Sequence, residues 1–125
     1  MDQRLRRHER LTARTDYTRC YRHGRRLRTR YFTVYAYRQG ECVTRLGLAV
    51  GKAVGIAVVR NRVKRRLREL FRRRKVLVPR GYDLFVRAVP ASALASYTAL
   101  EAAWCEAMAM LRAAEAFGHA GPKDG

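Results

Sequence analysis

The sequence predicts one α+β domain, a single β-sheet with helices packed on it, in the element order α-β-β-β-α-β-α. Its 125 residues match the usual size of one domain, and 48% of them are hydrophobic, enough for a modest core. Apolar side chains alternate along residues 31–38, which is typical of a strand. They recur at helical spacing along residues 58–75. Each pattern occurs again further along the chain, so helices and strands are expected to alternate.

The N-terminal part of the chain is predicted to be an arm, a short helix and a short strand. Residues 1–14 are rich in arginine and nearly without apolar side chains, so we expect a basic N-terminal arm. Thr15 or Asp16 can cap the helix, and Gly24 can end it. Residues 25–29 are expected to form the strand.

The next predicted strand, residues 31–38, has two faces of different character. One face carries Tyr31, Thr33, Tyr35 and Tyr37, and the other carries Phe32, Val34 and Ala36. A turn at residues 39–41 leads to a further strand over residues 43–51. Because the turn is short, these two strands are predicted to pair as a hairpin.

The C-terminal part is predicted to contain a strand at residues 82–89 and a long helix that Ser92 caps and Gly118 ends. The apolar stripe of this helix comprises Tyr97, Leu100, Trp104, Ala107, Met108 and Leu111. The predicted domain therefore covers residues 15–117, and residues 118–125 are expected to be a flexible tail.

The predicted helix at residues 58–75 carries a strongly basic run. Residues 60–75 have ten positive charges and one negative charge. Their net charge of +9 is half of the chain's net charge of +18. One side of the helix carries Val59, Val63, Leu67, Leu70 and Phe71. Much of the other side carries Arg62, Lys64, Arg65, Arg68, Arg72 and Arg73. A solvated surface is the ordinary explanation, but like charges four residues apart repel, at a cost of roughly a few tenths of a kcal/mol per pair. We therefore interpret this face as one that binds a polyanion.

The charge is distributed unevenly along the chain. Residues 1–90 carry a net charge of +20, and residues 91–125 carry −2. This balance favours nucleic acid or an anionic membrane surface as the partner of the first 90 residues. No stretch is long and apolar enough to span a bilayer, and we expect no signal peptide. Cys20, Cys42 and Cys105 are isolated and odd in number, which favours a reducing cytoplasm over a disulfide framework.

Four tyrosines are candidates for a second binding surface. Tyr17 and Tyr21 lie one turn apart on the predicted first helix, and Tyr31 and Tyr35 share a face of the strand. An aromatic stripe is more often part of a core, and this alternative stays open. Function is favoured because tyrosine tolerates a wet edge, because the strand has a separate apolar face, and because arginines lie nearby. Such rings suit the stacking of unpaired bases.

Catalytic and metal-binding patterns are weak. The ten carboxylates include no D-x-D or E-x-x-E pair that would bind two metal ions. His8, His23 and His119 are far apart, so a metal-free nuclease built on two histidines has little support. A zinc site from the cysteines and one histidine lacks any C-x-x-C spacing. Gly51 and Lys52 do not belong to a phosphate-binding loop motif. At the end of the strand, however, they can offer a backbone N–H group and a positive charge to a phosphate.

Two motifs between residues 45 and 72 are specific. The first is Arg45-Leu46-Gly47-Leu48-Ala49-Val50-Gly51-Lys52. The second is Ala57-Val58-Val59-Arg60-Asn61-Arg62-Val63-Lys64-Arg65, which Arg68-Glu69 and Phe71-Arg72 extend. They resemble the signature of the protein component of bacterial ribonuclease P, R-x-G-[hydrophobic]-x-V-x-K on a strand followed by A-V-x-R-N-R-[IV]-K-R on a helix. Weaker matches extend the resemblance over about residues 8–110.

The resemblance implies a fold and a function. The family fold is a two-layer α/β sandwich with an unusual left-handed βαβ crossover. The family's protein is a subunit of ribonuclease P, a ribonucleoprotein endonuclease that matures the 5′ ends of tRNA. Mg²⁺ ions held mainly by the catalytic RNA cleave the phosphodiester, so no catalytic residue is expected in the protein. The expected partners are that RNA and precursor tRNA, with no membrane and no required protein partner.

Two sets of site residues follow from the resemblance and the residue patterns together. The catalytic RNA is expected to contact Arg60, Asn61, Arg62, Lys64, Arg65, Arg68 and Arg72. The single-stranded 5′ leader of precursor tRNA is expected to contact Tyr17, Tyr21, Tyr31, Tyr35, Arg45 and Lys52. Asn61 has a second interpretation, as a residue at the helix start that bonds local backbone. The alternative function is a structural RNA-binding protein of the ribosomal type. It fits the composition equally well but does not explain the motifs or the tyrosine face.

Overall fold

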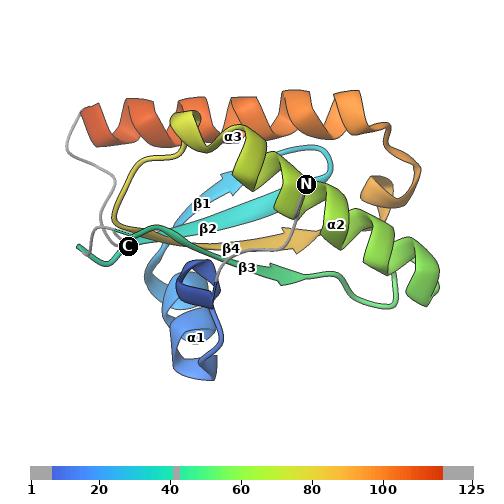
Figure 1. Cartoon of the computed structure of the whole chain (residues 1–125), viewed down its shortest axis with the longest axis horizontal. Helices are drawn as coiled ribbons and strands as arrows, with labels where there is room; N and C mark the ends of the chain where they lie inside the picture. The colour runs from blue at the N-terminus through green and yellow to red at the C-terminus, as the bar shows by residue number, and fades with distance from the viewer. Residues whose placement is uncertain (1–6, 41–42, 117–125) are drawn as a thin grey trace.

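The computed structural model describes residues 7–40 and 43–116, which form one α+β domain in the predicted element order (Figure 1). Its helices are α1 (Arg14–His23), α2 (Ala57–Arg73) and α3 (Tyr97–Ala116). Its strands are β1 (Arg25–Arg28), β2 (Phe32–Arg38), β3 (Arg45–Ala49) and β4 (Tyr82–Ala88). The short 3-10 helices are η1 (Arg7–Glu9), η2 (Lys75–Leu77) and η3 (Pro90–Leu94).

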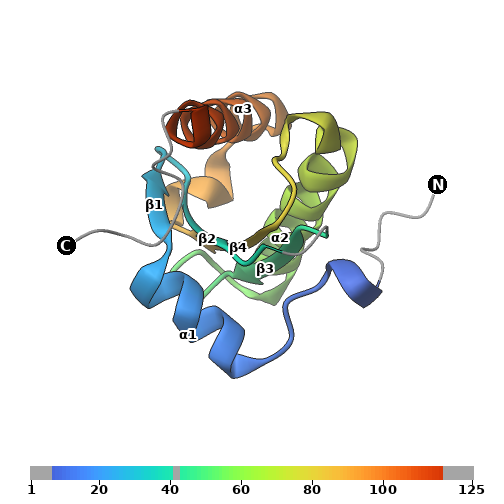
Figure 2. The same cartoon turned by 90° about the vertical axis from the view of Figure 1, so that its left-hand side faces the viewer.

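The sheet is covered on both faces, but unequally (Figure 2). α2 and α3 lie on one face, and the main core fills the space between them and the sheet. Phe32 and Val34 of β2 meet Trp104 of α3 there, and all three are fully buried. α1 lies on the opposite face. A small second core lies beneath it, formed by Leu11, Cys20 and Tyr35. The predicted two-layer sandwich therefore describes the main core, and α1 adds a partial third layer.

The strand order in the sheet is β1-β2-β4-β3. β2 pairs antiparallel with both β1 and β4, whereas β3 pairs in parallel with β4. The predicted hairpin between residues 31–38 and 43–51 is therefore wrong, because the hairpin partner of β2 is β1. β4 takes the place beside β2 because its seven residues match β2 along its whole length, while β3 has only five.

β3, α2 and β4 form a βαβ unit with a left-handed crossover, as the two views show together (Figures 1 and 2). Nearly all βαβ crossovers are right-handed. The handedness decides which face of the sheet α2 covers. A right-handed connection between the same two strands would place α2 on the face that α1 now occupies. The left-handed crossover therefore keeps α2 off the face that α1 occupies (Figure 2).

The helix starts differ from those predicted. α1 begins after Ala13 without a side-chain cap, so neither Thr15 nor Asp16 has that role. The predicted cap Ser92 is buried inside η3, where its hydroxyl donates to the Val89 carbonyl at 2.7 Å. A 3-10 helix forms there first because Pro90 fixes a helical backbone angle at its start. Ser96 caps α3 instead, and its oxygen accepts a hydrogen bond from the Ala99 amide at 3.0 Å.

The predicted N-terminal arm is in part a piece of the domain. Arg10 forms a parallel bridge with Leu46, and the Leu11 amide donates to the Leu46 carbonyl at 3.0 Å. This contact extends the sheet beyond β3, and Leu11 is buried. Glu9 is buried as well and pairs with Lys75 after α2. The rest of the arm, residues 1–6, and the predicted tail, residues 118–125, lie outside the described residues.

Candidate nucleic-acid interface

Four aromatic rings form a row on the α1 face of the sheet. Tyr17 contacts Phe85 edge to face at 5.3 Å between ring centroids. Phe85 stacks on Tyr35 at 5.7 Å, and Tyr35 contacts Tyr21 at 5.1 Å. We call these four residues the aromatic row. Tyr21 is 54% exposed, whereas Tyr35 is 8% exposed. The row therefore presents an open ring at its Tyr21 end and rests on the sheet elsewhere.

Close backbone approach holds the row in place. Gly47 of β3 lies directly under the Tyr17 ring, since a Cβ at this position would come within 2.5 Å of the ring. Gly24 follows α1, and a Cβ there would lie 2.5 Å from the Cys20 carbonyl and 3.1 Å from the Ala36 backbone. The Tyr17 hydroxyl donates to the Leu11 carbonyl at 2.7 Å. The ring thus has a fixed position between α1, β3 and the N-terminal segment.

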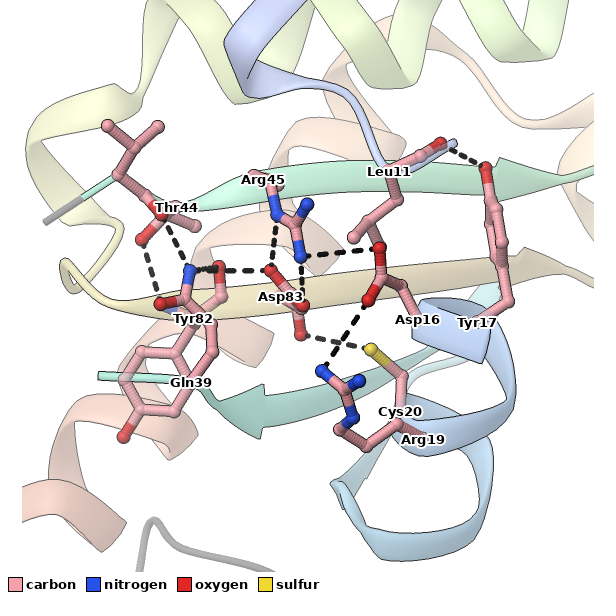
Figure 3. Close-up of polar contacts among 11 residues, drawn as sticks. Leu11, Asp16, Tyr17, Arg19, Cys20, Gln39, Thr44, Arg45, Tyr82 and Asp83 are labelled. Atoms are coloured by element: carbon pink, nitrogen blue, oxygen red, sulfur yellow. Dashed lines mark hydrogen bonds and ion pairs between the residues drawn. The ribbon is translucent and has the colours of Figure 1, made fainter. Parts of the chain in front are cut away.

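An ion-pair network joins α1 to the sheet (Figure 3). The Asp83 side chain on β4 has no exposed surface. Arg45 on β3 holds it with two hydrogen bonds, Nε to Oδ1 at 2.9 Å and Nη2 to Oδ2 at 2.8 Å. The same Nη2 lies 3.4 Å from Asp16 of α1. The pKa of Arg45 is raised above its ordinary value, chiefly by the hydrogen bond to Asp83. Arg45, expected from the sequence at the leader site, is therefore engaged with two carboxylates.

Of the other two predicted leader residues, Tyr31 lies away from the row. Tyr31 precedes β2 and packs against the main core, with the Arg30 guanidinium 5.6 Å from its ring centroid. The prediction that Tyr31 and Tyr35 lie on one face of a strand is therefore wrong, because the chain is still turning between β1 and β2 at residue 31. Lys52 is exposed in the turn between β3 and α2.

Two aromatic residues of this surface, Phe85 and Tyr37, were not among the predicted site residues. Phe85 belongs to the row, and it alternates in β4 with the core residues Leu84 and Val86. That alternation was the available signal, since it sets Phe85 on the same face as Asp83. Tyr37 packs against the small second core, and the Arg19 guanidinium lies 5.5 Å from its ring centroid.

The predicted basic helix is confirmed as α2, and its apolar side is buried. Its cations divide into two groups. The first group is bonded within the domain. Arg60 donates to the Gly55 carbonyl at 3.1 Å, Arg62 to Ala93 at 3.1 Å, and Arg66 to Ala95 at 3.0 Å. Ion pairs engage Arg73 with Glu69, Arg74 with Glu101, and Lys75 with Glu9. These contacts fix η3, α3 and the N-terminal segment to α2.

The second group has no acidic partner among the residues that the structure describes. It comprises Lys64, Arg65, Arg68 and Arg72, which we call the cationic stripe. Its members lie on adjacent turns of α2. Asn61 and Arg65 are exposed one turn apart at its N-terminal end. At this helix start the hydrogen bond to local backbone comes from Arg60, which donates to the Gly55 carbonyl, and the Asn61 side chain is exposed.

Within residues 7–40 and 43–116, no three His, Cys, Asp or Glu side chains are grouped closely enough to hold a metal ion. Cys20 is buried, and burial, followed by the nearby carboxylates of Asp83 and Asp16, raises its pKa to about 12. Its thiol therefore stays protonated at neutral pH. In the same part of the chain, no helix has the length and apolar character needed to cross a membrane.

Comparisons with known proteins agree on one family. The family model described as Ribonuclease P matches residues 5–112. The ribonuclease P protein component of Oleidesulfovibrio alaskensis is 51% identical over 84 residues, which cover 66% of this chain and 67% of that protein. The one from Thermotoga maritima is 38% identical over 86 residues, which cover 69% and 74%.

Solved structures give the same result. The RNase P protein of Staphylococcus aureus superposes with a TM-score of 0.75 at 27% identity, over 82% of this chain and 94% of that one. The protein from Thermotoga maritima superposes with a TM-score of 0.71 at 31% identity, over 77% and 91%.

Proposed function

The chain belongs to the ribonuclease P protein family, and from this premise we propose that its two sites bind two different RNAs. As a protein component of this tRNA-processing endonuclease, it associates with ribonuclease P RNA. In our proposal, the cationic stripe and Asn61 dock on that catalytic RNA. The aromatic row binds the single-stranded 5′ leader of precursor tRNA.

The observation that carries the leader assignment is the exposed Tyr21 ring at the end of the aromatic row. A ring that is 54% exposed and supported from behind by Tyr35 offers a free face to a base. Stacking of one base on an aromatic ring is worth about 1–3 kcal/mol and depends little on sequence. A leader of variable sequence therefore suits this surface.

Substrate selection follows from the difference between precursor and mature tRNA. Only the precursor has a leader that can stack on the row, so the row adds affinity for substrate and none for product. The protein thereby contributes binding rather than a catalytic group. We propose that the Mg²⁺ ions that assist phosphodiester cleavage are held mainly by the RNA.

The catalytic-RNA assignment rests on the cationic stripe. Four cations on consecutive turns, with Asn61 beside them, form a rigid surface for backbone phosphates. Arg60 and Arg62 were predicted at the same surface. Because each already bonds a backbone carbonyl, we propose that they shape this end of α2 and contact RNA only with their remaining N–H groups.

The test replaces the exposed ring. Tyr21→Ala should weaken the binding of precursor tRNA by the reconstituted holoenzyme about tenfold, from the loss of one stacked base. The binding of mature tRNA should stay unchanged. Tyr21→Phe is the matched control, because it keeps the ring and should retain most of the selectivity. Equal losses for precursor and mature tRNA in the alanine variant would contradict the leader assignment.

A further inference from the structure

A pocket of about 600 Å³ lies beside the C-terminal end of α2. Four segments line it, namely η1, the residues before β3, the end of α2 with η2, and the chain that leads into β4. Phe71, the α2 residue in its lining, lies about 15 Å along the helix from Asn61. Among the described residues that line the pocket, none belongs to the aromatic row or to the cationic stripe. The pocket is therefore distinct from both sites described above.

The exposed apolar surface of the pocket is aliphatic. Val43, Val76 and Val78 line it, and Val76 is 90% exposed. In η2, Leu77 packs against the main core, whereas its neighbour Val76 is left at the surface. Single exposed apolar residues are ordinary, but apolar side chains gathered in one pocket with a polar rim are typical of an interaction site.

Hydrogen bonds fix the shape of the pocket. The Thr44 hydroxyl donates to the Pro79 carbonyl at 2.6 Å and accepts from the Tyr82 amide at 3.2 Å. It thereby joins the start of β3 to the segment before β4. The Val78 amide closes η2 by donating to the Lys75 carbonyl at 3.0 Å. Because the pocket exists in the folded chain, its occupant does not have to order it.

The charge that the pocket offers to a ligand is positive. Lys75 and Arg80 are both exposed in its lining. The one acidic residue among the described lining residues is Glu9, which is buried and paired with Lys75. Arg80 has no acidic partner in the part of the chain that the structure describes. A carboxylate would therefore complement the Arg80 side of the pocket.

We propose that this pocket docks a protein partner through an acidic segment, which inserts an aliphatic side chain between the valines and places a carboxylate beside Arg80. RNA suits the pocket less well, because unpaired bases favour aromatic platforms and the valines offer none. The partner would be a third one, besides the two RNAs, and the proposal depends on neither RNA assignment.

The first experiment uses the full-length protein and two labelled synthetic peptides, without RNA. One peptide carries two leucines among aspartates, and in the other serines replace the leucines. Fluorescence anisotropy at about 0.15 M salt, where exposed charges are largely screened, should show about tenfold tighter binding of the leucine peptide. Equal affinities of the two peptides would overturn the proposal, because charge alone would then explain the binding.

Variants of exposed residues locate the binding. Val76→Ser should weaken the leucine peptide about tenfold, from the lost burial of one valine, and leave the serine peptide unchanged. Val58→Ser is the matched control, because Val58 is 71% exposed at the start of α2, outside the pocket. Equal effects of the two variants on the leucine peptide, or no effect of either, would place the binding elsewhere and contradict the proposal.

The charge contribution has its own matched pair. Arg80→Gln should weaken the leucine peptide about threefold, as expected for one exposed ion pair. Arg112→Gln removes the same charge from an exposed position on α3 and should have less effect. Equal weakening in both would show a general effect of net charge and remove the role of Arg80.

The second experiment asks whether RNA occupies the pocket instead. Val76→Ser should leave the affinity for catalytic RNA unchanged, whereas Arg65→Gln in the cationic stripe should lower it. An equal loss in the two variants would assign the pocket to that RNA and overturn the proposal. Since the peptide titrations contain no RNA, failure of the docking pocket and failure of the RNA assignments are distinguishable.

Discussion

At the scale of single residues, Gly47 is the position on which the aromatic row depends. Its backbone supports the Tyr17 ring directly, and any side chain would occupy the space of that ring. A Cβ at Gly47 would also lie 3.0 Å from the Cβ of Leu11. The glycine of the R-x-G motif therefore has a steric role in the site, and its backbone angles need no special conformation.

Replacing this glycine should separate packing from binding. Gly47→Ala should destabilise the domain by about 1–3 kcal/mol, the usual cost of overpacking, and displace Tyr17 from the row. Urea unfolding measures the first effect, and the precursor-to-mature affinity ratio measures the second. Gly51→Ala is the control, because nothing lies within 4 Å of a Cβ there and its backbone angle is ordinary. Equal stability of the two variants would contradict the steric role.

Cys20 predicts a fall of stability in alkaline solution. The pKa of its thiol rises from an ordinary 9 to about 12 in the folded chain. Between these values the unfolded chain loses the proton and the folded chain keeps it, so stability decreases as the pH rises above about 9. The slope from this group approaches about 1.4 kcal/mol per pH unit. Cys20→Ala should flatten the dependence of the unfolding free energy on pH between pH 9 and 10, which urea unfolding at several pH values measures.

The sequence located single site residues well where periodicity applied. Tyr17 and Tyr21 share a helix face because they lie one turn apart, and the structure brings both to the row. Tyr35 joined them because it lies in the middle of a clearly alternating strand. Tyr31 did not, because alternation cannot show where a strand begins. Phe85 was missed because alternation in β4 gives only its face, and nothing local shows that it meets a ring fifty residues away.

At the scale of secondary-structure elements, the Arg45–Asp83 pair connects β3 to β4, and Asp16 connects both to α1. The pair lies at the register position where Arg45 and Asp83 are direct neighbours across the parallel strands. Without the Arg45 guanidinium, the Asp83 carboxylate would be a buried charge with no ion-pair partner on β3. The network therefore fixes the position of α1 over the sheet.

Removing the guanidinium should be costly. Arg45→Met should destabilise the domain by about 3 kcal/mol, near the lower end for a broken buried pair because Arg45 is partly exposed. Urea unfolding measures the cost, and adding Asp83→Asn should recover part of it by removing the stranded charge. Amide hydrogen exchange should rise more in α1 than in α3. Uniform exchange in the two helices would argue against a positioning role for the network.

Element prediction failed where long-range pairing decides the outcome. The hairpin between residues 31–38 and 43–51 was expected from a short turn, but β4 competes for β2 and matches its full length. Which serine caps α3 also depended on context. Pro90 starts a 3-10 helix that includes Ser92, so Ser96 becomes the cap. The spacing of apolar residues predicts where helices and strands occur. It carries no information on which strands pair or on the handedness of the βαβ crossover.

At the scale of the whole molecule, the positive charge belongs to residues 1–90, which carry a net charge of +20, while residues 91–125 carry −2. The cations of residues 60–75 divide into those bonded within the domain and the four of the cationic stripe. Within this segment, only the second group can contact phosphates without breaking a hydrogen bond or an ion pair. Charge count alone therefore overestimates the number of RNA contacts, and the structure reduces the expected number for α2 to about four.

The salt dependence of catalytic-RNA binding should report this division. Four contacts give a slope of log K against log salt of about −3.6, and Arg65→Gln should reduce its magnitude by about 0.9. Arg74→Gln should change it less, because the Arg74 guanidinium pairs with Glu101. Affinities measured between 50 mM and 300 mM salt supply both slopes. Equal changes for the two variants would show that ion pairing within the protein does not limit contact with RNA.

Both edges of the sheet carry features that disfavour aggregation of the protein before it binds its RNA. An open edge strand can pair with the same strand of another chain and start aggregation. Residues 10 and 11 bond along β3 and cover part of that edge. β1 lies at the other edge, and three of its four residues are arginines, whose mutual repulsion disfavours pairing between copies. Newly made chains should therefore remain monomeric during the search for their RNA.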